Sequence, residues 1–256
     1  ETYQPIREAM KITGIRPVIT SKSVASTYED MEKAVNEALE QLDIDYIDIF
    51  LLHAARESID VYEKRAGALE CLKAYKAKGL IKAIGISTHN TRVAKMTAQR
   101  QDIDVIFCLI NKSGRGLLEG GIPDMIEAIR LNSEAGKGVY LMKVLGAGNL
   151  IDDYKGCMEF ARGIKGYHSI AVGMVTPEEV DFNVSYFNGE FEHKKMPSIK
   201  GNLKKYQVME ILCKGCKTCM DACPNYALEY SERTRKVSIN YNKCLTCGYC
   251  TSACPE

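Results

Sequence analysis

The segment CKGCKTCMDACP at residues 213–224 is repeated, with other residues between its cysteines, as CLTCGYCTSACP at residues 244–255. Each copy places cysteines at positions i, i+3, i+6 and i+10 and ends in Cys-Pro. This is the spacing of a ligand run for two [4Fe–4S] clusters, in which three thiolates bind one cluster and the fourth thiolate binds the other. The spacing predicts two crossed ligand sets: Cys213, Cys216 and Cys219 with Cys254, and Cys244, Cys247 and Cys250 with Cys223.

Two other uses of eight cysteines fit this spacing less well. Disulfide frameworks are typical of exported chains, and the sequence shows no apolar export segment. A zinc site uses two separated cysteine pairs around one tetrahedral ion, without a third cysteine at i+6. Residues 206–256 resemble the two-cluster bacterial-type ferredoxins, including residues 227–230 and 237–239, which flank a charged turn like a short hairpin. The resemblance implies electron transfer.

Composition limits the classes to which the rest of the chain can belong. The chain has 256 residues, is 46% hydrophobic and has a formal net charge of +1. This size predicts one large and one small domain. The charge gives no electrostatic footprint for nucleic acid, and no apolar run reaches the length of a membrane span. Clusters that oxygen would damage indicate a cytoplasmic, oxygen-poor setting. The other three cysteines, Cys71, Cys108 and Cys157, are expected to be small buried side chains.

Residues 1–195 show a different pattern, in which short β-branched runs alternate with amphipathic stretches. Six strands are predicted, at residues 18–20, 46–52, 81–86, 105–110, 139–142 and 169–172. Helices are predicted between them, one after a Ser26–Glu29 capping box and others at residues 62–75, 90–100, 122–135 and 177–187. Repeated strand–helix units with buried strands indicate a parallel sheet.

The predicted strands end in polar residues or glycine: Lys22, His53, Ser87, Asn111, Lys143 and Gly173. A TIM-type (β/α)8 barrel carries its chemistry at these carboxyl ends. An open doubly wound sheet would show a Gly-rich phosphate turn, and the sequence has none. Six strands cannot close such a barrel, so we expect its first two strands to be missing from this chain. The predicted layout is an incomplete barrel at residues 1–195, a linker at 196–205 and a small α+β ferredoxin-like domain at 206–256.

Five segments of the predicted barrel resemble the aldo-keto reductases. They are VITSKS (18–23), LEQLDIDYIDIFLLH (39–53), LKAYKAKGLIKAIGISTHN (72–90), GVYLMKVLGAGNL (138–150) and SIAVGMVTPEEVDFNV (169–184). Together they cover most of residues 1–187 in the order of the family. The resemblance implies a (β/α)8 barrel that transfers hydride between a nicotinamide cofactor, NAD or NADP, and a small carbonyl or alcohol substrate.

The resemblance also implies two catalytic residues. Lys22 matches the family's lysine, which lowers the pKa of a tyrosine that acts as general acid. His53 matches the histidine that orients the carbonyl oxygen. The family's tyrosine and aspartate would precede the segments quoted above. Tyr3 falls just after the tyrosine's place, in a helix-like stretch, and is not assigned that role.

Four residues are predicted to bind a cofactor. Ser87 matches the position that holds the nicotinamide carboxamide, and Asn183 matches an asparagine that contacts adenine. Asn111 and Gly173 are further candidates because they follow predicted strands. Hydride carries two electrons and a cubane cluster takes one, so a flavin or another carrier that handles both would link them, or else the clusters serve a partner and the barrel performs separate chemistry. The phosphate of a flavin could bind at the loops 143–149 and 173–176, where the following helix would offer free N–H groups.

Two hypotheses about function stay open. In the first, the protein is an iron–sulfur oxidoreductase that binds a small substrate at the barrel mouth and exchanges electrons with a redox partner protein. In the second, the barrel is catalytically inactive and the molecule is an electron-transfer or interaction module. An Asp followed about five residues later by Tyr, ahead of the given sequence, would favour the enzyme.

Overall fold

A computed structural model describes residues 2–190, 197, 205–223 and 225–255 of the chain. Internal contacts divide the chain into two units, Glu1–Met142 with Glu159–Ile170, and Lys143–Met158 with Ala171–Glu256. Apart from residues 197 and 205, the predicted linker at 196–205 lies outside the described residues. The predicted domain limits therefore stay a prediction.

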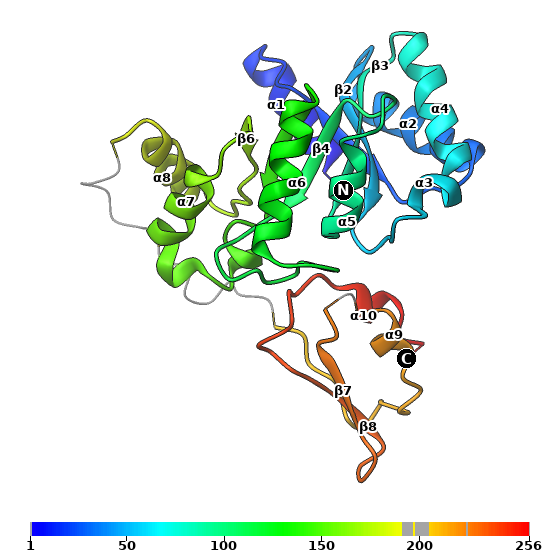
Figure 1. The fold of residues 1–256 in the computed structure, drawn as a ribbon, viewed down its shortest axis with the longest axis vertical. Coiled ribbons are helices and arrows are strands. Elements are labelled where there is room, and N and C mark those ends of the chain that lie inside the picture. The colour runs from blue at the N-terminus through cyan, green and yellow to red at the C-terminus, as the bar shows by residue number, and fades with distance from the viewer. Residues whose placement is uncertain (1, 191–196, 198–204, 224, 256) are drawn as a thin grey trace. The chain divides into compact units, whose positions relative to one another are not determined.

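The first unit is built on a parallel sheet of six strands that lie in chain order (Figure 1). The strands are β1 (Thr20–Ser23), β2 (Ile47–Ala54), β3 (Ile81–Thr88), β4 (Val105–Leu109), β5 (Gly138–Met142) and β6 (Ser169–Ile170). The helices are α1 (Tyr3–Thr13), α2 (Tyr28–Leu42), α3 (Val61–Lys64), α4 (Ala66–Ala77), α5 (Thr91–Thr97) and α6 (Ile122–Glu134). The six predicted strands are confirmed. Within the described residues β1 and β6 are the edges of the sheet, and the expectation of two further strands stays a prediction.

The register of the sheet separates its two faces, because successive side chains of a strand point to opposite sides. On one face Ser21 pairs with Phe50, and Phe50 pairs with Ile84; all three are buried. Since the strands follow one another in chain order, right-handed crossovers place the connecting helices on a single side. Helix α4 packs against β2 and β3, and α6 packs against β4 and β5. We call this buried side the helix-covered face.

The opposite side of the sheet, which we call the inner face, carries the polar strand ends. Lys22 lies opposite Leu51, and His53 lies opposite Ser87 on the neighbouring strand. Farther along the sheet the rings of Phe107 and Tyr140 stack on this face, with centroids 3.9 Å apart. The inner face therefore holds both residues that the family resemblance assigns to catalysis.

Two helix predictions need correction. Thr27, not Ser26, caps α2, because Thr27 Oγ1 accepts the Asp30 N–H at 3.2 Å while the Ser26 carbonyl accepts the Ala68 N–H at 3.2 Å. The helix predicted at residues 62–75 is broken at Arg65 into α3 and α4. At Arg65 the backbone leaves the helical region (φ −114°, ψ 26°), and the Arg65 side chain donates to the His53 carbonyl at the end of β2.

The three remaining cysteines are buried, as predicted. Cys71 lies in α4, Cys108 in β4 and Cys157 in α7 (Tyr154–Gly163), which passes from the second unit to the first. Burial raises the pKa of Cys71 to about 11 and that of Cys108 to about 12. Both stay protonated thiols at neutral pH, so they behave as small apolar groups.

The second unit contains two segments of different character. The first segment holds the 3₁₀ turns η1 (Gly146–Gly148) and η2 (Ile151–Asp153) and the helix α8 (Pro177–Phe187). The second segment holds α9 (Thr218–Asp221), β7 (Leu228–Ser231), β8 (Lys236–Ile239) and α10 (Tyr249–Ser252). Strands β7 and β8 pair antiparallel, so the predicted hairpin is confirmed. Among all described residues, no helix has both the length and the apolar character that crossing a bilayer requires.

Candidate functional site

Each cysteine loop turns through two residues with a left-handed backbone. In the first loop these are Gly215 (φ 67°) and Lys217 (φ 66°), and in the second they are Thr246 (φ 51°) and Gly248 (φ 82°). The glycines are required, because a Cβ on Gly215 would collide with a carbonyl oxygen of the hairpin. A Cβ on Gly248 would lie 2.9 Å from the Tyr206 hydroxyl. These turns coil the cysteines around a central space and start α9 and α10.

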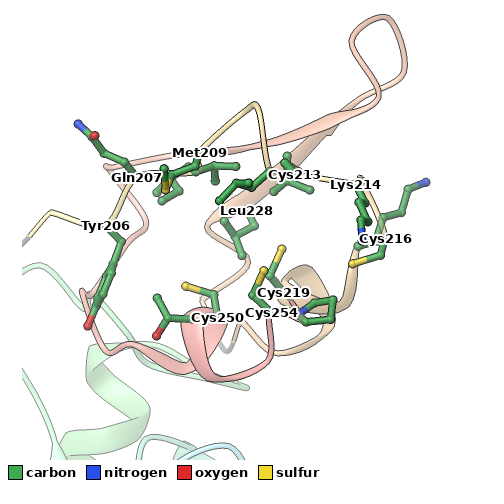
Figure 2. Close-up of a pocket in the computed structure, with 18 residues that line it drawn as sticks. Tyr206, Gln207, Met209, Cys213, Lys214, Cys216, Cys219, Leu228, Cys250 and Cys254 are labelled. Carbon is green, nitrogen blue, oxygen red and sulfur yellow. The ribbon is translucent and has the colours of Figure 1, made fainter.

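Five cysteines border a cavity of about 230 Å³ in the C-terminal domain (Figure 2). They are Cys213, Cys216, Cys219, Cys250 and Cys254. The cavity thus joins the first three cysteines of one quartet to the last cysteine of the other. Burial raises the pKa of Cys219, and the nearby Cys216, Cys250 and Cys254 raise it further. We call this space the first cavity.

A smaller cavity of about 20 Å³ lies among the other cysteines. It is bordered by Cys223, Cys244, Cys247 and Cys250. Burial raises the pKa of Cys250, and next in effect come Cys247, Cys223 and Cys244. This second cavity joins the first three cysteines of the second quartet to the last cysteine of the first. Cys250 borders both spaces.

The cysteine arrangement suits a group larger than one metal ion. Among the described residues, no three His, Cys, Asp or Glu side chains converge as they would around a single ion. The thiols are instead spread around two spaces, and thiolate sulfur is the ligand that iron–sulfur clusters use. Hydrogen bonds already reach some of these sulfurs: Ala227 N–H donates to Cys223 Sγ at 3.3 Å, and Thr246 N–H donates to Cys244 Sγ at 3.4 Å. The donor set and its surroundings therefore fit two clusters.

Lys236 is a neighbour of the first cavity that the sequence pattern did not indicate. Its Nζ donates to the backbone carbonyl of Cys213, although the two residues are 23 positions apart. The antiparallel hairpin brings them together, because β8 carries Lys236 back toward the first cysteine loop. A positive charge is thereby held beside one predicted cluster ligand.

In the first unit, His53 and Ser87 are held together on the inner face. His53 Nδ1 lies 2.9 Å from Ser87 Oγ, and the two residues are direct neighbours in the register of β2 and β3. Buried Arg65 donates to the His53 carbonyl at 3.0 Å and to Glu57 Oε1 at 3.1 Å, which fixes the loop after β2. Lys22 is exposed on the same face, at the end of β1. No sequence signal marked Arg65, since it stood inside a predicted helix.

Neither described tyrosine near this sheet is placed as a proton donor. The Tyr3 hydroxyl lies 2.5 Å from Ser21 Oγ, and Ser21 points to the helix-covered face, away from Lys22. Tyr140 is on the inner face, but it stacks on Phe107 and burial raises its pKa. A general acid of this kind needs a lowered pKa, so the geometry leaves both tyrosines without that role.

Two of the predicted cofactor residues are engaged in hydrogen bonds within the protein. Asn111 Oδ1 accepts from Ser113 Oγ at 2.8 Å and from Arg115 N–H at 3.0 Å. Asn183 Oδ1 accepts the Tyr154 hydroxyl at 2.8 Å. Gly173 lies in an exposed connection with open space at its Cβ position. Ser87 and Asn111 belong to the first unit, and Gly173 and Asn183 belong to the second.

The start of α8 differs from the expected phosphate site. Glu179 Oε2 accepts the Val175 N–H at 2.7 Å, and Thr176 Oγ1 accepts the Glu179 N–H at 3.3 Å. Two N–H groups that were expected to be free are therefore engaged. A carboxylate already lies where the phosphate would have to bind, and two negative groups repel each other there. The expectation of free N–H groups at this helix start is wrong for these two residues.

Comparison with protein families identifies both parts of the chain. Residues 6–115 match the model of the aldo/keto reductase family, and residues 205–255 match the model of a 4Fe–4S dicluster domain. The chain joins an aldo/keto reductase domain to a 4Fe–4S dicluster domain. The combination predicted from the sequence, an aldo/keto reductase domain followed by a 4Fe–4S domain, is thereby confirmed.

Solved structures support the fold of the reductase domain. A Pseudomonas aeruginosa protein assigned to the aldo-keto reductases is 20% identical, with a TM-score of 0.61 over 74% of this chain and 73% of that chain. The holo form of an aldo-keto reductase from Bacillus halodurans is 20% identical, with a TM-score of 0.58 over 76% of this chain and 73% of that chain. At this identity the likeness shows the fold alone. The predicted barrel class is confirmed.

Curated relatives with ferredoxin-type or oxidoreductase-subunit names match short stretches of the chain. The polyferredoxin-like subunit of an aliphatic sulfonate oxidoreductase from Pyrococcus furiosus is 51% identical over 37 residues, 14% of this chain and 21% of the relative. The NADH-quinone oxidoreductase subunit I of Pelobacter propionicus is 29% identical over 58 residues, 18% of this chain and 31% of the relative. The chain thus covers between about a fifth and a third of these relatives.

Proposed function

We propose that this protein is an iron–sulfur oxidoreductase whose C-terminal domain carries two [4Fe–4S] clusters. The observation that supports this most strongly is the pairing of each cavity with three cysteines of one quartet and the last cysteine of the other. One cluster is held by Cys213, Cys216, Cys219 and Cys254, and the other by Cys244, Cys247, Cys250 and Cys223. When bound, such clusters supply one-electron transfer.

In the same proposal, a small carbonyl or alcohol substrate binds at the barrel mouth beside Lys22 and His53. Ser87 positions His53: if the serine hydroxyl donates to Nδ1, the proton of the imidazole is on Nε2. Nε2 can then donate a hydrogen bond to a carbonyl oxygen at the inner face. Lys22 contributes a positive charge at the strand end, which favours a substrate oxygen that gains negative charge.

We infer that a nicotinamide or flavin, if the barrel uses one, does not place its phosphate at the start of α8. Glu179 occupies that helix start with its own carboxylate. Ser87, Asn111, Gly173 and Asn183 stay the proposed cofactor residues. Asn111 would act by holding its loop, and Asn183 by joining α8 to Tyr154 at the start of α7. The protein works in an oxygen-poor cytoplasm and exchanges electrons with a redox partner protein.

A second candidate function is an electron-transfer module with a catalytically inactive barrel. Its support is specific: Tyr3 is bound to Ser21 on the helix-covered face, and Tyr140 is buried against Phe107. Neither of these two tyrosines is thus placed to donate a proton beside Lys22. If the protein turns over a carbonyl substrate and the Lys22→Met variant does not, the oxidoreductase hypothesis is favoured over the inactive barrel.

The cluster proposal is tested by counting iron in pairs of cysteine variants. Anaerobically purified protein should contain about eight iron and eight sulfide per chain, as two cubanes require. Cys216→Ala and Cys254→Ala should each damage one cluster, and the double variant should lose no more than that one. The matched double variant Cys247→Ala/Cys254→Ala removes one ligand from each predicted set, so it should lose both clusters.

If Cys216→Ala/Cys254→Ala lost both clusters and Cys247→Ala/Cys254→Ala lost only one, the ligand sets would not be crossed. One zinc per chain and no sulfide would exclude clusters altogether.

A further inference from the structure

The two cysteine loops have the same spacing but different charges. Lys214 and Lys217 stand between the cysteines of the first loop, where the second loop has Leu245 and Gly248. Residues 244–255 contain no charged residue at all, whereas residues 213–224 contain these two lysines and Asp221. Cluster binding needs only the cysteines and the turns, so it does not account for the difference.

Both lysines lie at the mouth of the first cavity. Lys214 and Lys217 are exposed and line that cavity, and Cys216 between them is itself exposed. Figure 2 shows Lys214 and Cys216 beside the cavity. Lys217 Nζ lies 4.0 Å from the centre of the Tyr230 ring and 3.8 Å from Glu232 Oε1. The ring and the carboxylate hold the lysine in place, and the carboxylate offsets part of its charge.

Lys236 places a third cation beside the first cysteine loop. Lys236 donates to the Cys213 carbonyl, so the first loop has one half-buried and two exposed ammonium groups around it. The described lining of the second cavity contains no Asp, Glu, Lys or Arg. The lysines in the described linings of the two cavities are therefore all at the first cavity.

Apolar side chains lie beside the lysines. Met209, Ile211 and Leu212 are 63%, 89% and 48% exposed, and Met209 and Leu212 line the first cavity. An apolar centre with a charged rim is the usual composition of a protein–protein interface. The exposed ligand Cys216 would bring a bound cluster close to this surface. We call the surface formed by residues 209–217 the basic port.

We propose that the basic port is the docking surface for an acidic one-electron carrier protein. This inference rests on the proposed function, because it assumes a cluster at the first cavity. Charge complementarity identifies the partner: lysines attract an acidic surface and repel a second copy of this chain, which would bring the same lysines together. In the exchange, one electron leaves the reduced carrier and one cluster gains it, and no bond forms or breaks.

The test measures electron transfer to the loaded protein by rapid mixing. The probe is a reduced flavodoxin, a small acidic flavoprotein, and the variant is Lys214→Glu/Lys217→Glu. At low ionic strength the second-order rate constant of the variant should be about tenfold or more below that of the unmodified protein. Added salt should reduce this difference, as it does for electrostatically steered association. Reduced methyl viologen, a small cation that needs no docking surface, should react at least as fast with the variant as with the unmodified protein.

The matched control is Lys243→Glu, which reverses the charge of an exposed residue directly before the second cysteine loop. It should leave the flavodoxin rate within about twofold. An unchanged rate in the double variant, or an equal fall in Lys243→Glu, would overturn the inference. So would a matching loss of the viologen rate, because the lysines would then act on the cluster and not on docking. Iron analysis of the unmodified protein decides the proposed function separately, since it depends on neither lysine.

Discussion

Replacing Lys236 by methionine is expected to lower the reduction potential of one cluster and leave the other unchanged. Reduction adds a negative charge to a cluster, and a nearby ammonium group stabilises that charge. Lys236 Nζ donates to the carbonyl of Cys213, a predicted ligand of the first cluster only. Lys236 is half-buried, so solvent screens its charge only in part.

The size of the effect follows from the geometry of the cysteine. A cysteine's sulfur and its own carbonyl oxygen are about 4 Å apart, which puts the ammonium about 7 Å from the cluster. Coulomb's law gives about 2.4 kcal/mol at that distance with an effective dielectric constant of about 20. Screening at a half-buried position reduces this to about 1.2 kcal/mol. For one electron this equals about 50 mV, since 59 mV corresponds to a factor of ten.

The assay is a redox titration followed by the EPR signal of the reduced clusters. In Lys236→Met one of the two transitions should move down by about 50 mV. In Lys236→Arg, which keeps the charge, both should stay in place. In a Cys247→Ala background, where only the first cluster is expected, the remaining transition should be the one that moves. Equal movement of both transitions, or an equal shift in the arginine variant, would refute the reasoning.

Three further outcomes are expected. Lys22→Met should keep iron content and the unfolding midpoint but abolish carbonyl turnover; loss of soluble protein would instead make Lys22 structural. NADH or NADPH added anaerobically without flavin should not bleach the cluster absorbance near 400 nm, since hydride carries two electrons and a cluster takes one; rapid bleaching would contradict this. Tyr62→Phe should lower the free energy of unfolding by about 1 kcal/mol in urea titrations, because it removes the buried 2.8 Å contact between Tyr62 and Thr97; an unchanged midpoint would show that contact to be neutral.

Local patterns predicted the parts of the fold that depend on local physics. Strand periodicity placed all six strands, and the helix predicted at residues 177–187 was found with the same limits. The capping box was misplaced by one residue, because Ser26 and Thr27 are equally good caps in sequence. The feature that distinguishes them is a contact with a residue far away in the sequence, because the Ser26 carbonyl accepts the N–H of Ala68 in α4.

The candidate sites divide in the same way. Cysteine spacing predicts the cluster ligands, because a tight loop determines which thiols can converge. The contacts of Lys236 and Arg65 could not be predicted, since each joins residues that only the hairpin or the sheet brings together. The carboxylate of Glu179 was visible in the sequence. Its effect on the helix start was not, because that depends on the rotamer that reaches Val175.

The electron path is better explained by a separate partner than by direct exchange within the chain. A two-electron hydride site and one-electron clusters need an intermediate carrier, and a flavin is the usual one. The helix start considered for a flavin phosphate holds the carboxylate of Glu179 instead. The domain that carries the cysteines has its own proposed docking surface, the basic port, where Lys214 and Lys217 lie beside the exposed Cys216. Charge at one cavity and none in the described lining of the other would give the two proposed clusters different tasks. The cluster at the basic port is therefore the one that an external carrier should reach first.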